Sequence, residues 1–137
     1  MPECAYVALG SNLGDRSGFL TYARNRLSRL PKTVFLAESS IEETAPIGPV
    51  EQGPYLNQMV LLRTDLSPRE LLRSCHAIEQ EAGRVPGERW GARTLDLDIV
   101  RFGDRIARWD DLVLPHPEFS NRAFWQREIA ELEHHVP

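Results

Sequence analysis

The residues best suited to chemistry lie between Gly83 and Gly103, where a basic loop leads into a strand that carries two aspartates. From Leu95 to Phe102 apolar and polar residues alternate, a pattern typical of a half-buried strand. Asp96 and Asp98 then share one face, about 6.5 Å apart. Two neighbouring carboxylates repel each other unless a cation lies between them. Oxygen ligands of this kind suit Mg²⁺ that carries phosphates.

The arginines upstream of this strand are suited to bind phosphate oxygens. Arg84, Arg89 and Arg93 belong to a segment whose prolines and glycines predict a long loop. Arginine makes permanently charged, bidentate contacts with phosphate. Taken separately, an Asp-X-Asp strand is more often a solvated edge, and three arginines are more often a solvated loop. Together they favour a site for a metal–polyphosphate substrate.

The composition predicts one globular domain over residues 1–137. Apolar residues make up 42% and charged residues 26%, and the net charge of −4 argues against a coat for nucleic acid or an anionic membrane. Cys4 and Cys75 have no disulfide-framework spacing, the first residues do not resemble a signal peptide, and no apolar run reaches the length of a membrane span. We therefore expect a cytoplasmic location.

The order of the predicted elements is strand, helix, strand, strand, helix, strand, followed by a hairpin at 104–108 and a helix at 124–133. The strands are expected at 5–9, 33–40, 55–64 and 95–102. The first helix ends before Pro31, and Ser67 opens the second with a capping box. This order predicts an α+β, ferredoxin-like fold, an antiparallel sheet with helices on one face and a ligand cleft on the other. Asp96 and Asp98 are expected to face that cleft.

The run from Arg89 to Val100 resembles the signature of the 6-hydroxymethyl-7,8-dihydropterin pyrophosphokinases, enzymes of folate biosynthesis. Five further stretches agree in order, at 8–15, 44–49, 55–57, 114–117 and 121–124. The resemblance covers nearly the whole chain. It implies a kinase that transfers the β,γ-pyrophosphoryl group of ATP to the hydroxymethyl group of the pterin and releases AMP, with ATP and the pterin as partners of a monomer.

The resemblance also implies roles for individual residues. Two Mg²⁺ ions are expected on Asp96 and Asp98, and the catalytic residues are expected to be Arg84, Arg93, Asp96 and Asp98. The ATP-binding residues are expected to be Glu79, Arg84, Arg93, Ile99, His116 and Arg122. The pterin-binding residues are expected to be Thr44, Pro46, Ile47, Tyr55, Asn57, Trp90 and Phe124. A flat heterocycle needs aromatic faces and an amide at its edge, which Tyr55, Phe124 and Asn57 would supply.

Several of these residues have simpler interpretations. Tyr55 and Phe124 are more often core residues when taken alone, and His116 lies between prolines, where it would serve as a turn residue. Glu79 would pair with a neighbouring arginine. An RNA-binding ferredoxin-like domain is disfavoured because its sheet face would be basic and aromatic, whereas this one carries Asp96 and Asp98.

The sequence departs from the family pattern in four places. Pro86 replaces a second basic residue in the arginine loop, and His76 stands where glutamine is frequent. Glu42 stands where an aromatic residue is frequent, and residues 124–129 replace a more apolar run that contains proline. The alternative function is therefore a catalytically weak relative that binds the nucleotide or the pterin.

Overall fold

The computed structural model describes residues 2–46, 52–83 and 94–137. Its main sheet has the strand order β2-β4-β1-β5, with β3 paired to β4, and every pair is antiparallel. The strands are β1 (Glu3–Ser11), β2 (Thr33–Glu38), β3 (Glu42–Thr44), β4 (Tyr55–Thr64) and β5 (Asp96–Phe102). The predicted ferredoxin-like arrangement is confirmed.

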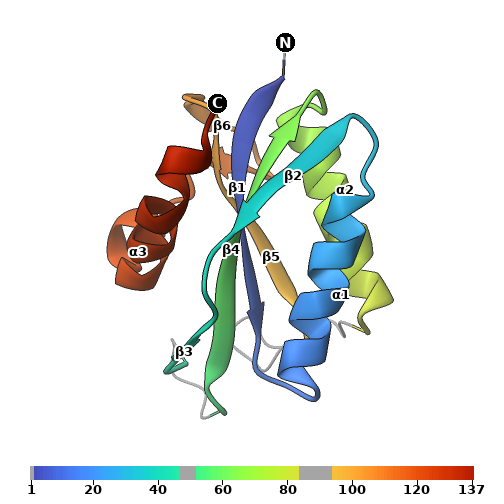
Figure 1. The fold of residues 1–137 in the computed structure, drawn as a ribbon, viewed down its shortest axis with the longest axis vertical. Helices are drawn as coiled ribbons and strands as arrows, with labels where there is room; N and C mark the ends of the chain where they lie inside the picture. Colours follow the sequence, from blue (N-terminus) through green and yellow to red (C-terminus); the bar gives the residue numbers. More distant parts are fainter. Residues whose placement is uncertain (1, 47–51, 84–93) are drawn as a thin grey trace.

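Helices lie on both faces of this sheet (Figure 1). Helices α1 (Arg16–Ser28) and α2 (Pro68–Glu81) cover one face, as predicted, whereas α3 (Ala123–Leu132) covers part of the other. Strands β6 (Ala107–Arg108) and β7 (Val113–Leu114) form a small second sheet, and short 3₁₀ helices occupy Phe119–Asn121 and Glu133–His135. In the described ranges no helix has the length and apolar character required to span a membrane.

Apolar residues fill both sides of the sheet. The side of α1 and α2 buries Val7, Leu97 and Ile99 among others, and the side of α3 buries Tyr6, Met59, Leu61 and Val100. Strand β5 supplies both clusters because it alternates, as predicted. A β-bulge after Ile99 leaves Val100 without a partner on β1, and this extra residue packs under α3.

Helix α2 begins with the predicted capping box. The Ser67 side chain accepts a hydrogen bond from the Glu70 N–H at 3.2 Å, and the Glu70 carboxylate accepts one from the Ser67 N–H at 2.8 Å. Pro68 occupies the first helical position, where no N–H is needed. The start of the helix is therefore fixed by the local sequence.

We expect Ser67→Ala to lower the free energy of unfolding by about 1 kcal/mol, because the Glu70 N–H loses its acceptor. Urea denaturation monitored by circular dichroism measures this. Ser67→Asp keeps an acceptor at the same place and serves as the control. An unchanged midpoint in Ser67→Ala would show that the box contributes nothing to stability.

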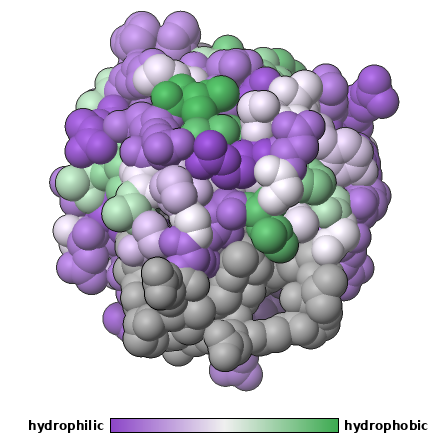
Figure 2. Space-filling model, turned by 90° about the horizontal axis from the view of Figure 1, so that it is seen from below, coloured by the Kyte–Doolittle hydropathy of each residue, from purple (hydrophilic) through white to green (hydrophobic). Residues whose placement is uncertain are grey.

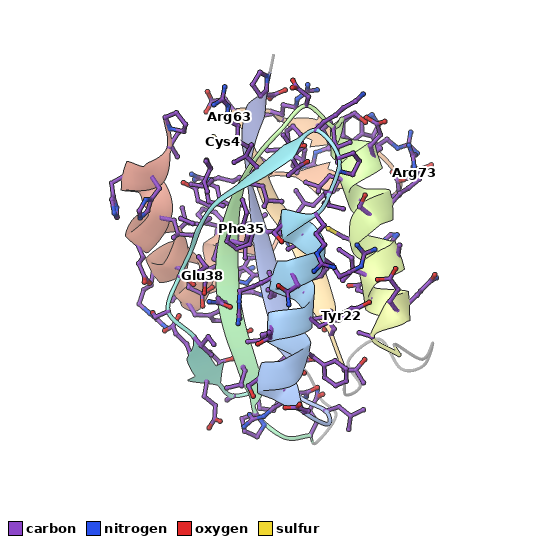
Figure 3. The ribbon with its side chains drawn as sticks, turned by 45° about the vertical axis from the view of Figure 1, so that its right-hand side comes forward. Cys4, Tyr22, Phe35, Glu38, Arg63 and Arg73 are labelled. Carbon is purple, nitrogen blue, oxygen red and sulfur yellow. The ribbon has the colours of Figure 1, made fainter. Side chains whose placement is uncertain are left out.

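A polar contact joins α1 to the end of α2. The Tyr22 hydroxyl donates to Glu81 at 2.7 Å, and Arg26 donates twice to the same carboxylate, at 2.7 and 3.0 Å. Figure 3 shows Tyr22 on the part of α1 that lies beside α2. The hydrogen bonds from Arg26 and Tyr22 lower the pKa of Glu81 to about 2, so the carboxylate is ionised at neutral pH.

Some element boundaries differ from those expected. Strand β1 extends to Ser11, past the predicted end at Leu9, and β2 ends at Glu38 instead of residue 40. Strand β3 was not predicted because three residues carry too little periodicity. It forms because its backbone pairs with β4.

Candidate active site

One row of residues crosses four strands on the face that carries α3. Gly10 of β1 lies opposite both Asp96 of β5 and Asn57 of β4, and Asn57 lies opposite Glu42 of β3. Directly opposed residues of antiparallel strands project to the same side. A Cβ atom on Gly10 would lie 3.4 Å from both Asn57 Oδ1 and Tyr55 Cδ1. The absence of a side chain on Gly10 therefore lets the Tyr55 ring and the Asn57 amide pack close to the β1 backbone beside Asp96.

The row lies at the end of the sheet where β1 ends. Seen from that end, the described surface is mostly hydrophilic, with apolar residues in separate patches (Figure 2). Farther along the same face, the next positions on β1 and β4 are the apolar residues Ala8 and Met59, which lie under α3. The helix thus covers the apolar half of the face and leaves the polar half uncovered, whereas the sequence predicted helices on the opposite face only.

Asp96 and Asp98 project from β5 on this polar half, as predicted. Both are half-buried. The Tyr55 hydroxyl donates a long hydrogen bond of 3.5 Å to Asp96 Oδ2, and His116 Nε2 lies 3.6 Å from Asp98 Oδ1. The two carboxylates therefore have different neighbours, a phenol for the first and an imidazole for the second.

The orientation of His116 is set by the backbone. Its N–H donates to the Val100 carbonyl at 2.8 Å, and its ring Nδ1 accepts from the Glu118 N–H at 3.0 Å. A nitrogen that accepts carries no proton, so in the neutral ring the proton is on Nε2, which faces Asp98. His116 is thus a hydrogen-bond donor aimed at the aspartate pair.

Trp125 of α3 organises the cationic side of the site, although no sequence motif marked it as a site residue. Its ring meets that of His116 edge to face, with centroids 4.9 Å apart, and the Arg122 guanidinium lies 4.4 Å from its centroid. Arg122 Nε is buried and has no hydrogen-bond acceptor within the described ranges. The sequence feature that could have identified Trp125 is its helical spacing with Ile129 and Leu132, which marks the buried stripe of α3.

Glu79 of α2 is buried and accepts a hydrogen bond of 2.7 Å from the Leu97 N–H. Leu97 lies between the two aspartates on an edge strand, so this carboxylate replaces a missing strand partner. The sequence suggested that Glu79 binds ATP or pairs with an arginine, and neither role includes this hydrogen bond to the Leu97 N–H. Glu79 supports the strand that presents the aspartates.

A cleft of about 310 Å³ runs along the free edge of β5. Its lining combines apolar side chains (Leu72, Leu97, Ile99, Leu112, Val113), carboxylates (Glu79, Asp96, Asp98, Asp110, Asp111) and two histidines (His76, His116). Among these, Asp111 accepts hydrogen bonds from Arg69 at 3.0 and 3.3 Å. Such an acidic cleft binds a polyphosphate only together with cations.

The structure also brings together part of the expected pterin set. Thr44 lies opposite Tyr55, and the Asn57 side-chain amide donates to the Thr44 hydroxyl. Phe124 is the second residue of α3 and is partly buried against the apolar cluster beneath that helix. Pro46 follows β3 and is half-buried. The expected residues Ile47, Arg84, Trp90 and Arg93 lie outside the described residues.

The donor set of the aspartate pair fits Mg²⁺. Within residues 2–46, 52–83 and 94–137 no three His, Cys, Asp or Glu side chains are grouped to hold a metal ion. Mg²⁺ is usually bound by one or two carboxylates, with water and substrate phosphates completing its six ligands. Asp96 and Asp98, half-buried on one face beside an acidic cleft, are suited to this arrangement.

The fold and the site define an α+β protein of the ferredoxin-like class with paired carboxylates beside a cleft at the edge of its sheet. Residues 6–134 match the model of the 7,8-dihydro-6-hydroxymethylpterin-pyrophosphokinase (HPPK) family, and the chain belongs to this family. The resemblance inferred from the sequence motifs is confirmed.

Named relatives agree with this assignment. The 2-amino-4-hydroxy-6-hydroxymethyldihydropteridine pyrophosphokinase of Bacillus subtilis (strain 168) is 41% identical over 132 residues, which are 96% of this chain and 79% of the relative. The enzyme of the same name from Pseudomonas aeruginosa is also 41% identical, over 96% of this chain and 82% of its own. A crystal structure of an HPPK-DHPS in complex with substrates has a TM-score of 0.70 at 13% identity, covering 96% of this chain and 40% of that one, and supports the fold.

Proposed function

We propose that this protein is a 2-amino-4-hydroxy-6-hydroxymethyldihydropteridine diphosphokinase. It transfers the β,γ-pyrophosphoryl group of ATP to the hydroxymethyl oxygen of 6-hydroxymethyl-7,8-dihydropterin and releases AMP, a step of folate biosynthesis. Membership of the HPPK family supports this activity. The structural observation that carries it is the pair Asp96 and Asp98, on one face of β5 beside the acidic cleft.

Asp96 and Asp98 would hold two Mg²⁺ ions together with the phosphates of ATP. When bound there, Mg²⁺ would supply charge neutralisation for the phosphates. His116, with its proton on Nε2, would donate to a phosphate oxygen beside Asp98. Arg122 would supply a fixed positive charge, because stacking on Trp125 restrains its guanidinium.

The cleft along β5 is suited to the nucleoside part of ATP. Ile99 and Leu72 line it with apolar surface for a purine ring. Glu79 acts indirectly in this proposal, because its bond to the Leu97 N–H fixes the strand between the two aspartates. Arg84 and Arg93 remain proposed phosphate ligands on the basis of the sequence motif.

The pterin would lie over the row that crosses the sheet. Tyr55 and Phe124 would offer aromatic faces to the flat ring. Because the amide nitrogen of Asn57 donates to Thr44, its Oδ1 remains to accept from an N–H group of the pterin edge. Gly10 lies between Asn57 and Asp96 without a side chain of its own, so a pterin over Asn57 would be next to the aspartates.

The nucleotide product tests the proposed function. With ATP, Mg²⁺ and the hydroxymethyl dihydropterin, we expect one AMP for each pterin consumed, because attack at the β-phosphorus leaves AMP. Ion-exchange chromatography separates AMP from ADP, and omission of the pterin is the control. Pterin-dependent ADP would contradict pyrophosphoryl transfer. Nucleotide binding without any AMP would identify the catalytically weak relative instead.

A further inference from the structure

Glu128 of α3 is a buried carboxyl group that the proposed mechanism does not use. Glu128 is 1% exposed. Neither of its side-chain oxygens accepts a hydrogen bond from an N–H or O–H group of the described chain. An ionised carboxylate without donors is costly to bury, whereas a protonated one is neutral and can itself donate. The surroundings of Glu128 therefore favour its protonated form.

The carboxyl group that interacts with Glu128 is that of Glu42 on β3, and a proton on Glu128 would supply the donor that Glu42 Oε2 and the Glu128 oxygens lack. One oxygen of Glu42, Oε1, accepts from Arg127 Nη2 at 2.9 Å, while its Oε2 receives no hydrogen bond from the remaining described donors. The arginine keeps Glu42 ionised, and the ionised Glu42 keeps the proton on Glu128. This is a carboxyl–carboxylate pair with one proton.

The pKa values of the two groups move in opposite directions. Burial, the hydrogen bond to Glu42 and the charge of Glu42 together raise the pKa of Glu128 to about 9. For Glu42, burial alone would raise the pKa, but the hydrogen bonds from Glu128 and Arg127 outweigh it and the net pKa is lowered. The remaining charged neighbour is Glu131, which raises the pKa of Glu128 further.

The pair joins the two elements that carry the proposed pterin residues. Glu42 lies directly opposite Asn57, whose side chain holds Thr44, and Glu128 lies one helical turn after Phe124 on α3. A change in the distance between Glu42 and Glu128 would therefore move one wall of the pocket relative to the other.

We propose that Glu42 and Glu128 share one proton that holds β3 against α3, and that they are positioning residues for the pterin pocket. The identification of the pocket's ligand as a pterin rests on the proposed function. The shared proton does not depend on that function. Removing the proton would leave two adjacent carboxylates, which repel each other and separate the strand from the helix. The Glu131 carboxylate of α3 accepts a hydrogen bond from the Ser40 N–H at 2.9 Å. This bond keeps the segment between β2 and β3 attached to α3.

The first test is a ¹³C NMR titration of the free protein from pH 6 to 10. In the wild type we expect a glutamate carboxyl carbon to titrate in the alkaline range, with the amide signals of Thr44, Asn57 and Phe124 following the same midpoint. Glu128→Gln offers Glu42 a permanent N–H donor, so it should lose the carboxyl titration and keep the three amide signals constant. Glu131→Gln removes a charge from the same helix and should retain the titration.

Thermal unfolding gives a second readout that needs no substrate. A carboxyl whose pKa is higher in the folded than in the unfolded chain stabilises the fold less as the pH rises between the two values. The unfolding temperature of the wild type should therefore fall relative to that of Glu128→Gln from about pH 5 to pH 9. If the unfolding temperatures of the two proteins change with pH in parallel, the proposal that Glu42 and Glu128 share a proton is wrong.

The enzymatic test compares the KM for the pterin in the wild type and in Glu128→Gln. The wild-type KM for the pterin divided by that of Glu128→Gln should rise about tenfold between pH 8 and 10. The same ratio for ATP should stay constant, because neither Glu42 nor Glu128 lines the cleft proposed for the nucleotide. Any titration of the pterin itself cancels in the ratio. A constant pterin ratio beside an alkaline carboxyl titration would overturn the positioning role. If no AMP forms at any pH, the proposed function fails, and the three amide signals alone then decide the positioning role.

Discussion

Asp98→Ala is expected to abolish pyrophosphoryl transfer while the protein remains folded. A carboxylate that holds Mg²⁺ against the phosphates supplies several kcal/mol of transition-state stabilisation, and a loss of about 4 kcal/mol lowers kcat about 10³-fold. The Asp98 side chain is 40% exposed, and its described contact is the imidazole of His116 at 3.6 Å. Its removal also relieves repulsion from Asp96, so the free energy of unfolding should stay constant or rise slightly.

The measurement combines AMP formation at saturating substrates with urea denaturation of the same samples. Asp104→Ala is the matched control, because Asp104 is an exposed aspartate in the turn that follows β5. It removes the same charge from the same part of the chain without touching the cleft. Turnover of Asp98→Ala within a few-fold of the wild type would contradict the metal-binding role.

Trp125→Ala is expected to lower the free energy of unfolding by about 3–5 kcal/mol, the usual cost of truncating a large buried aromatic side chain. Trp125 is 2% exposed and packs with Tyr6, Met59 and Val100 beneath α3. The same change frees the guanidinium of Arg122, whose desolvated cation–π contact is worth about 2 kcal/mol. The KM for ATP should therefore rise about tenfold or more.

Trp125→Phe separates the two effects. It retains an aromatic face for Arg122 and most of the buried area, so both the loss of stability and the rise in KM should be smaller. Urea midpoints with an unchanged m-value report stability, and initial rates at varied ATP report the site. An unchanged KM for ATP in folded Trp125→Ala would show that Trp125 supports the core without positioning Arg122.

The sequence by itself determined the features whose signals are local. Alternation along residues 95–102 predicted that Asp96 and Asp98 share a face, and the register of β5 against β1 shows that they do. The Ser67 capping box predicted the start of α2. These predictions succeed because side-chain direction on a strand, and the need of a helix terminus for hydrogen bonds, depend on neighbouring residues.

The tertiary structure decided which residues face each other. The row of Asp96, Gly10, Asn57 and Glu42 depends on the pairing of four strands, and no local pattern encodes the register between distant segments. The role of Gly10 follows from that row. In the sequence Gly10 marked only the end of a strand, whereas in the fold its lack of a side chain lets Tyr55 and Asn57 approach β1 closely.

The position of α3 was the largest difference between the prediction and the structure. The spacing of Trp125, Ile129 and Leu132 marks an apolar stripe, but a stripe does not specify the surface on which it packs. The second sheet face supplies that surface only after Tyr6, Leu61 and Val100 have come together from three strands. The contacts of Trp125 with His116 and Arg122, and the burial of Glu128 against Glu42, follow from this packing. They join segments far apart in the chain, and therefore only the folded chain determines them.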